Sequence, residues 1–364
     1  MSHVFCTDLS REAGDPLPGS GAHAERNLLI SWPRARWQRN LRHASDMPPD
    51  LAAQLDALAA SGRRVNLIHR RDQPAEVHEV ILMPERRRLQ LERSALLAFV
   101  EALAAGEDLE RWPSTPQHHD LVLCCTHGKK DKCCARYGYR SYKALARAVE
   151  EHRLPFDVWE SSHLGGCRFA ASIILLSPVR KYGRIEPDQA LPMLQAEAQG
   201  QRFLPGYRGA SHLTPAQQCA EVAALQWLAR DSALPCVELA LVEDSALAPE
   251  EMPGHLGGSS SSSSDNDGDN EPQYRRQIWR WRQSGEGEGE GEGEGEGEGE
   301  GEGEGEGKAK AKGERASGEL VVHCHTLTLA RIDMCSDIDQ GPSPSQVWRA
   351  ASVQSIDAGY RQYS

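Results

Sequence analysis

The chain has 364 residues, ten cysteines and a formal net charge of −12, and its length predicts two domains. A segment of alternating Gly and Glu, residues 285–307, supplies 11 of the acidic residues, and the rest of the chain carries a net charge of about −1. A nearly neutral folded part excludes the strongly basic surface that is typical of nucleic-acid-binding proteins.

The N-terminus is polar, and no apolar run approaches the ~20 residues that cross a bilayer. We therefore expect a cytoplasmic protein with no signal peptide and no membrane contact. Cysteines in such a protein are more often metal ligands or reduced thiols than parts of a disulfide framework.

The first 111 residues predict an extended arm followed by a small α/β unit. Residues 1–24 are rich in turn-forming Gly and Pro and predict the arm. Within residues 25–111, hydrophobic periodicity predicts a strand, a helix, two strands and a helix, at 28–30, 51–58, 65–68, 77–83 and 94–105. This is the order of elements in a thioredoxin-like unit. Cys6 and His69 stand alone here, so we expect no metal site in this half.

A second unit of the same kind is predicted at residues 117–245. The apolar run Leu121–Leu123 predicts a buried strand that ends at Cys125. Further elements follow in the order helix, strand, strand, helix, helix, at 142–149, 157–160, 171–176, 187–198 and from 215 onward. Thr214 is predicted to cap the last helix, with Pro215 at its first position.

The C-terminal part changes composition. Residues 246–273 are rich in Ser, Asp and Gly and predict a disordered linker. Residues 274–335 predict a β-hairpin whose loop contains the Gly-Glu repeat 285–307 as a disordered insert, and residues 336–364 predict a tail. The predicted fold is therefore α/β: two thioredoxin-like units packed together, with a C-terminal β-hairpin extension and a disordered low-complexity insert.

Four potential metal ligands lie in two loops of the second unit: Cys125, Cys134, His163 and Cys167. The first two follow the predicted strand in LVLCCTHGKKDKCCARYG, with eight residues between them. The last two flank the glycine turn of SSHLGGCRF. A strand-helix-strand unit with parallel strands brings both loops to the same end of one sheet.

This ligand set suits two kinds of metal centre. A [2Fe-2S] cluster takes two protein ligands per iron, usually thiolates, and imidazole replaces thiolate in some proteins. Zinc accepts three Cys and one His, but structural zinc sites typically use Cys pairs separated by two to four residues. Two loops that each supply a pair of ligands favour the two-iron centre, and zinc stays the alternative.

The ordered motifs CTHGKKDKCC, VWESSHLGGCRFA and YGR resemble the sucrase/ferredoxin-like family, the thioredoxin-like [2Fe-2S] proteins with histidine ligation. Members have a Cys-x8-Cys pair followed by a His-x3-His pair. The resemblance implies cluster ligands at Cys125, Cys134 and His163. Cys167 occupies the position of the second histidine, which implies a three-Cys, one-His cluster if Cys167 ligates. The family name implies no glycosidase activity, and no paired-carboxylate motif supports one.

Residues next to these ligands leave alternatives open. Cys133 competes with its neighbour as a ligand, whereas Cys124 faces the other side of its strand and is expected in the core. His127 is expected to be hydrogen-bonded within its loop. Lys130 and Arg168 are predicted near the cluster, where cations stabilise its negative charge and attract an acidic redox partner. A solvated loop is the alternative for Lys130.

The sequence therefore predicts an electron carrier that holds one [2Fe-2S] cluster and transforms no substrate. One alternative is a thiol-disulfide oxidoreductase on the same fold, which is disfavoured because no Cys-x-x-Cys pair follows the first strand. The other is a structural zinc module. The expected partners are redox proteins with an acidic contact surface.

Overall fold

The computed structural model describes residues 4–71, 73–74, 76–230, 237–253, 271–283 and 316–356. The Gly-Glu repeat and most of the predicted linker lie outside the described residues. Within the described part, no helix combines the length and apolar character that crossing a bilayer requires.

The first unit contains the predicted elements and one further strand. Its helices and strands are β1 (Asn27–Ser31), α2 (Pro49–Ala60), β2 (Arg64–His69), β3 (Val77–Met83), β4 (Arg87–Glu92) and α3 (Leu96–Ala105). Helix α3 is capped by Gly106, whose φ of +69° is the left-handed conformation that terminates many helices. The strand missing from the prediction is β4, which pairs with β3.

The second unit repeats this order and then extends it. It contains β6 (Asp120–Cys125), η3 (Cys134–Gly138), α4 (Tyr139–His152), β7 (Phe156–Ser161), η4 (Cys167–Phe169), β8 (Ile173–Leu176), β9 (Val179–Tyr182), α5 (Ala190–Ala198), β10 (Tyr207–Ala210) and α6 (Pro215–Leu228). The predicted start of α6 is confirmed, because the Thr214 hydroxyl accepts a hydrogen bond from the Gln217 backbone N–H. Strands β9 and β10 are missing from the prediction.

All strands of both units join one sheet, together with the short β5 (Thr115–Pro116). The strand order is β10-β9-β8-β6-β7-β2-β1-β3-β4-β5. In each unit the first two strands are parallel, and the third is antiparallel to the first. An antiparallel pair, β2 with β7, connects the two units and places Ile68 opposite Ser161. The two predicted units are therefore halves of one continuous mixed sheet.

Each half-sheet has one face covered by the helices of its own unit. In the first half, Ile30 and Leu67 pack with α2 and α3. In the second half, Val122 and Leu175 pack with α4 and α5. The opposite faces of the two halves share a third core, in which Leu29 lies in the same apolar cluster as residues of β6 and β8. This shared core holds five buried cysteines: Cys6, Cys125, Cys133, Cys134 and Cys167.

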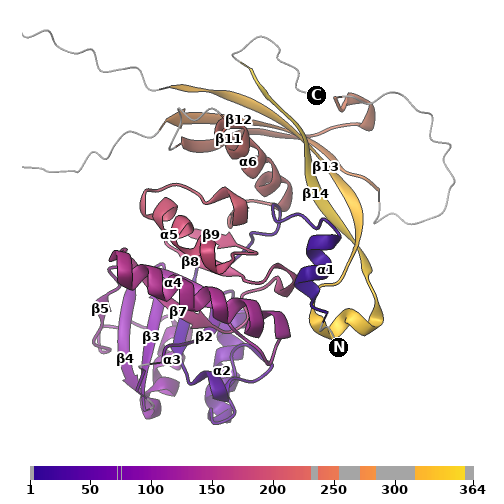
Figure 1. Cartoon of the computed structure of the whole chain (residues 1–364). Coiled ribbons are helices and arrows are strands. Elements are labelled where there is room, and N and C mark those ends of the chain that lie inside the picture. Colours follow the sequence, from indigo (N-terminus) through magenta and orange to yellow (C-terminus); the bar gives the residue numbers. More distant parts are fainter. Residues whose placement is uncertain are drawn as a thin grey trace, which may run out of the picture.

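A second sheet of four strands lies near the C-terminus. It consists of β11 (Val237–Ala246), β12 (Tyr274–Gln283), β13 (Ser317–Arg331) and β14 (Ser343–Ser355), paired in that order. The predicted hairpin corresponds to the antiparallel pair β12 and β13. Trp279 and Leu320 are buried in the same core as α6 residues, and Figure 1 shows this sheet above the large one, with α6 against it.

Two segments predicted as an arm and a tail contain regular structure. The N-terminal arm contains helix α1 (Cys6–Glu12), because Phe5 and Cys6 are buried in the shared core. The predicted tail contains β14, which pairs antiparallel with β13 and buries Val347. Helix α1 buries its apolar residues against parts of the chain that are distant in sequence. Strand β14 has few buried apolar residues. Local periodicity therefore reveals neither segment.

Candidate metal centre

Parallel strands bring the two ligand loops together. Strands β6 and β7 pair in parallel, with Cys125 opposite Ser161 at their carboxyl ends. The loop after β6 leads to Cys134 at the start of η3, and the loop after β7 leads through His163 to Cys167 at the start of η4. Both loops therefore leave the sheet at the carboxyl ends of these two neighbouring strands.

The four predicted side chains form a ring of neighbours, here called the Cys/His ring: Cys125, Cys134, Cys167 and His163. The thiol of Cys134 interacts with those of Cys125 and Cys167. The His163 ring interacts with the same two thiols, and its Nδ1 lies 3.4 Å from Cys167 Sγ. The three cysteines are each at most 2% exposed, and His163 is half-buried.

A close helix-strand contact brings Cys134 to Cys125. Residues of η3 form a π-helical turn that leads into α4. A Cβ at Gly138 would overlap the Cys125 backbone oxygen, so only glycine permits this approach. The preceding residue in the strand, Cys124, faces the opposite core, and its thiol donates to the Gly138 carbonyl oxygen.

Two glycines turn the second loop back toward the ring. Gly165 and Gly166 have φ values of +89° and +75°, a conformation that other residues rarely adopt. Because His163 and Cys167 lie on either side of this turn, their side chains meet at one point. The glycine turn predicted from the sequence is therefore what closes the ring.

The first unit holds the second loop in place. The Arg64 guanidinium donates to the His163 carbonyl oxygen at 2.6 Å. The Asn66 amide donates to the Ser162 hydroxyl at 3.0 Å and to the His163 carbonyl at 3.2 Å. The Leu67 backbone N–H also donates to the Ser162 hydroxyl. Strand β2 thus supports the ring although the first unit provides none of its four members.

His127 links the first loop to both units. Its Nε2 lies 2.6 Å from the Gln38 carbonyl oxygen, and its Nδ1 accepts from the His163 backbone N–H at 3.2 Å. Nε2 therefore carries the proton, because a carbonyl can only accept. The expectation of a hydrogen-bonded His127 agrees with this geometry, although Gln38 belongs to the first unit.

The ring favours thiolates at two of its positions. Interaction with the Cys134 thiol, followed by the His163 ring, lowers the pKa of Cys125 despite burial. The same two neighbours lower the pKa of Cys167. Burial opposes protonation of His163, but the thiolates of Cys125 and Cys167 raise its pKa to about 9. Such thiolates are the form of cysteine that binds metals.

Two basic residues that the sequence does not indicate also act on the ring. Arg64 and the buried Lys181 both interact electrostatically with Cys125. Of the two predicted cations, Arg168 is engaged in ion pairs with Asp15 and Asp333 at 2.6 and 2.8 Å. Lys130 is half-buried and acts electrostatically on His127. Arg64 and Lys181 lie on strands outside the two ligand loops, so the loop motifs do not mark them.

Cys133 belongs to a different group of side chains. Its Sγ lies 3.4 Å from Cys6 Sγ and 3.2 Å from Cys335 Sγ. The geometry therefore places Cys134, and not Cys133, beside Cys125. Cys6, which the sequence analysis treats as isolated, has two cysteine neighbours because α1 packs into the shared core.

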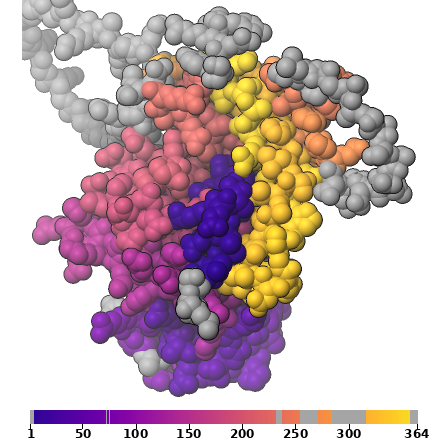
Figure 2. Space-filling view, turned by 45° about the vertical axis from the view of Figure 1, so that its right-hand side comes forward, coloured from indigo at the N-terminus to yellow at the C-terminus, as the bar shows by residue number. Residues whose placement is uncertain are grey.

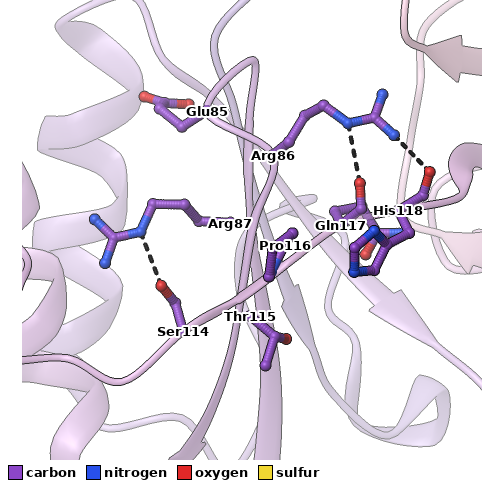
Figure 3. A pocket seen from close by; sticks show the side chains of 8 residues that line it. All are labelled: Glu85, Arg86, Arg87, Ser114, Thr115, Pro116, Gln117 and His118. Carbon is purple, nitrogen blue, oxygen red and sulfur yellow. Dashed lines mark hydrogen bonds between the residues drawn. The ribbon is translucent and has the colours of Figure 1, made fainter. Parts of the chain in front are cut away.

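The surface pocket lined by residues 85–87 and 114–118 is not part of this centre. Its cavity has a volume of about 490 Å³. Figure 3 shows that its arginines are engaged by the protein itself, with Arg86 donating to the carbonyls of Gln117 and His118 and Arg87 donating to the Ser114 hydroxyl. None of the Cys/His ring residues lines it.

The fold and the ring define an α/β protein with a candidate metal centre at the carboxyl ends of two central strands, β6 and β7. The chain belongs to the sucrase/ferredoxin-like family, whose model matches residues 17–209. This range includes most of both units, as far as β10, and the whole Cys/His ring. Helix α1 and the four-stranded sheet lie outside it.

Among curated proteins, the chain is similar to "Altered inheritance of mitochondria protein 32" of Clavispora lusitaniae, with 37% identity over 78 residues. The match spans 21% of this chain and 29% of that protein. Among solved structures, it is similar to the thioredoxin-like [2Fe-2S] ferredoxin of Aquifex aeolicus. The identity is 11%, the coverage is 25% of this chain and 96% of the ferredoxin, and the TM-score is 0.22. A second structure of that ferredoxin gives the same TM-score with 90% of its chain covered.

Proposed function

We propose that this protein is a one-electron carrier with a [2Fe-2S] cluster held by Cys125, Cys134, His163 and Cys167. The observation that carries the proposal is the closed ring of three thiols and one imidazole, supplied in pairs by two loops. Thiolates and imidazole are the side chains that bind such clusters. When bound, the cluster would supply the redox chemistry, and the chain would position, shield and tune it.

The arrangement of the ring in two pairs of ligands favours two metal ions over one. Ligand atoms around a single tetrahedral zinc ion lie within ~4 Å of one another, given Zn–S distances of ~2.3 Å. Among the described residues, the group whose ligand atoms all lie within 4.8 Å of one another is Cys6, Asp131, Cys133 and Cys335, and not the Cys/His ring. In the ring, one loop supplies Cys125 and Cys134 and the other supplies His163 and Cys167, which matches a centre with two ligands on each of two irons.

The surroundings suit an anionic centre. Three thiolates give the cluster a negative charge that increases by one on reduction. Arg64 lies close enough to interact with Cys125, and a cation stabilises the reduced form more than the oxidised form. The half-buried His163 is the ring member most open to solvent, and we propose that electrons enter and leave near it.

We also propose that the partner proteins present an acidic surface. Lys129 and Lys132 are exposed on the loop between Cys125 and Cys134. Opposite charges accelerate association and make its rate fall as salt screens them. Reduction by an acidic ferredoxin reductase should therefore slow with ionic strength, and the Lys132→Ala variant should show a weaker salt dependence.

The test of the centre is anaerobic reconstitution of the full chain with iron and sulfide. We expect two irons and two sulfides per chain, a red-brown colour and an EPR signal on one-electron reduction. Cys134→Ser and Cys167→Ser should lower iron content and change the spectrum. Cys124→Ala is the matched control, because this neighbouring thiol faces the opposite core.

Two outcomes would contradict the proposal in different ways. A colourless protein that binds zinc in the ring would replace the electron carrier with a structural zinc module. If Cys167→Ser left iron content and the spectrum unchanged, the cluster would stand but its fourth ligand would be another residue.

A further inference from the structure

A second group of potential ligands joins three distant parts of the chain; we call it the Cys3Asp group. Cys6 begins α1, Asp131 and Cys133 precede η3, and Cys335 begins the 3-10 helix η8 (Cys335–Gln340). The Cys6 and Cys335 positions lie outside the range that the family model matches. Figure 2 shows the N-terminal segment, in indigo, lodged directly against the C-terminal segment, in yellow.

The spacing of these atoms fits one tetrahedral ion. The three Sγ–Sγ distances are 3.4 Å for Cys6–Cys133, 3.2 Å for Cys133–Cys335 and 3.7 Å for Cys335–Cys6. Thiolates around a tetrahedral zinc ion, with Zn–S of ~2.3 Å, are separated by ~3.8 Å. The carboxylate oxygens of Asp131 lie 3.9 and 3.8 Å from Cys6 Sγ. The four side chains therefore need only small shifts to surround an ion.

The Asp131 carboxylate lacks a charged partner. It is 3% exposed, and no Lys, Arg or His of the described residues forms an ion pair with it. A buried carboxylate without a cation is costly. A metal ion at the centre of the group would supply the missing positive charge.

Backbone N–H groups orient the potential ligands of the Cys3Asp group. The N–H groups of Cys133 and Cys335 each donate to one Asp131 oxygen at 2.8 Å. The Cys6 N–H points at Cys335 Sγ at 3.5 Å. Each carboxylate oxygen keeps a further lone pair, so these bonds fix the aspartate without using up its capacity to bind metal.

We propose that Cys6, Asp131, Cys133 and Cys335 bind one structural Zn²⁺ ion, separate from the Cys/His ring. Three thiolates with one carboxylate suit borderline Zn²⁺ better than Cu(I), which prefers sulfur alone, or Ca²⁺, which prefers oxygen. Four protein ligands close the coordination shell, as in structural sites. The proposal does not depend on the electron-transfer function.

The ion would fasten α1 and η8 to the loop that carries Cys134. Cys133 and Cys134 are adjacent, and the Tyr137 hydroxyl, three residues on, donates to Asp8 of α1 at 2.9 and 2.8 Å. Zinc at the Cys3Asp group would therefore hold α1 and η8 over the outer side of this loop. Because metal binding couples to folding, α1 and η8 would be held in their folded positions only when zinc is bound.

The test is separate counting of zinc and iron in the full chain, purified anaerobically and then incubated with Zn²⁺ alone under reducing conditions. Wild type should hold one zinc per chain outside the ring. Cys6→Ser and Cys335→Ser should lose it while the iron content and cluster spectrum stay the same. Cys125→Ser should do the reverse, losing iron and keeping this zinc. Cys219→Ser, at a buried thiol beside Cys324, is the matched control and should keep both metals.

Two further measurements keep the proposal falsifiable if a cysteine variant misfolds. Asp131→Asn should keep the fold, and its zinc affinity should fall at least about tenfold. Co²⁺ in place of zinc should give the sulfur-to-metal charge-transfer absorption of three thiolates in wild type, reduced in Cys335→Ser. The proposal is overturned if reduced wild type binds no zinc outside the ring, or if zinc content is unchanged in Cys335→Ser. It is also overturned if the mass of the native chain is lower by two hydrogens and the missing hydrogens map to a disulfide between two of these cysteines.

Discussion

The two α/β units share one strand order but differ at the ends of their parallel strands. The order is β4-β3-β1-β2 in the first unit and β9-β8-β6-β7 in the second. After β1 the chain runs from Trp32 to Pro48 before α2 begins, whereas only eight residues separate Cys125 of β6 from Cys134 of η3. The short connection places the start of η3 directly against the carboxyl end of β6.

This difference shows that the fold alone does not create the candidate metal centre. The first unit has the same scaffold, but it provides supporting contacts from Gln38, Arg64 and Asn66 instead of ligands. The second unit adds the short connection, the tight contact at Gly138 and the glycine turn before Cys167. The comparison can be tested by altering each of these features in turn.

The largest effect is expected from Gly138→Ala. This change prevents the close contact between Gly138 and the Cys125 backbone, a contact that the second unit has and the first unit lacks. Gly138 has helical dihedral angles, φ −60° and ψ −43°, so alanine would be favoured there by ~1 kcal/mol on helix propensity. Its Cβ, however, would overlap the Cys125 carbonyl oxygen. We expect a destabilisation of about 3 kcal/mol or more, measured by thermal unfolding, together with loss of iron on reconstitution.

Gly200→Ala separates this steric effect from backbone strain. Gly200 has a φ of +73°, and beyond its chain neighbours no atom of the described residues lies within 4 Å of its hypothetical Cβ. Its substitution should cost about 1 kcal/mol and leave iron content unchanged. A Gly138→Ala protein as stable as wild type and loaded with iron would show that the helix start need not touch the strand end.

The second effect concerns the ligand type at His163. His163→Cys would surround the cluster with four thiolates, and the extra negative charge should lower the reduction potential by on the order of 100 mV. Cys167→His is the matched converse and should raise it, because it replaces a thiolate with a neutral ring. EPR-monitored redox titration measures both shifts. Equal potentials in the two variants would mean that neither residue ligates iron.

The sequence predicts the Cys/His ring because its parts are local. All four members lie between residues 125 and 167, and parallel pairing of β6 with β7 is enough to bring their loops together. The paired α/β units follow from hydrophobic periodicity for the same reason. What the sequence cannot predict is how the two units join, because the antiparallel contact of β2 with β7 has no local signature.

The Cys3Asp group illustrates the limit of such reasoning. Cys6 lies 125 positions from Asp131, and Cys335 lies 202 positions from Cys133. Their convergence depends on α1 packing into the shared core and on β13 leading the chain back to it. Arg64 approaches the ring in the same non-local way. Spacing in the sequence carries no information about such contacts.

The third effect is a pH dependence at the junction of the two units. His23 Nε2 lies 2.8 Å from Asn27 Oδ1 at the start of β1. Burial, followed by repulsion from Lys181 of the second unit, lowers the pKa of His23 to about 3. Between about pH 6.5 and 3 the unfolded chain therefore binds a proton that the folded chain does not. Stability from this residue is present above that range and is lost as the pH falls through it.

At about pH 5.5 the loss should be about 1.4 kcal/mol relative to about pH 7.5. The free energy of unfolding is measured at both pH values for wild type and for His23→Gln, which cannot titrate at this position. Between the higher and the lower pH, wild type should lose about 1.4 kcal/mol more stability than His23→Gln. If wild type and variant lost stability in parallel, His23 would titrate equally in the folded and unfolded chains.

The smallest effect tests whether the first unit tunes the centre that it supports. Arg64→Met removes a cation that interacts with Cys125, and it should lower the reduction potential by about 40 mV, equivalent to ~1 kcal/mol for one electron. Arg147→Met is the matched control, because it removes the same charge from a side chain that is 76% exposed on α4. Screening by solvent should keep that shift close to zero. Equal shifts in both variants would mean that only net charge matters, whereas a shift confined to Arg64→Met would show that a unit without ligands helps to set the potential.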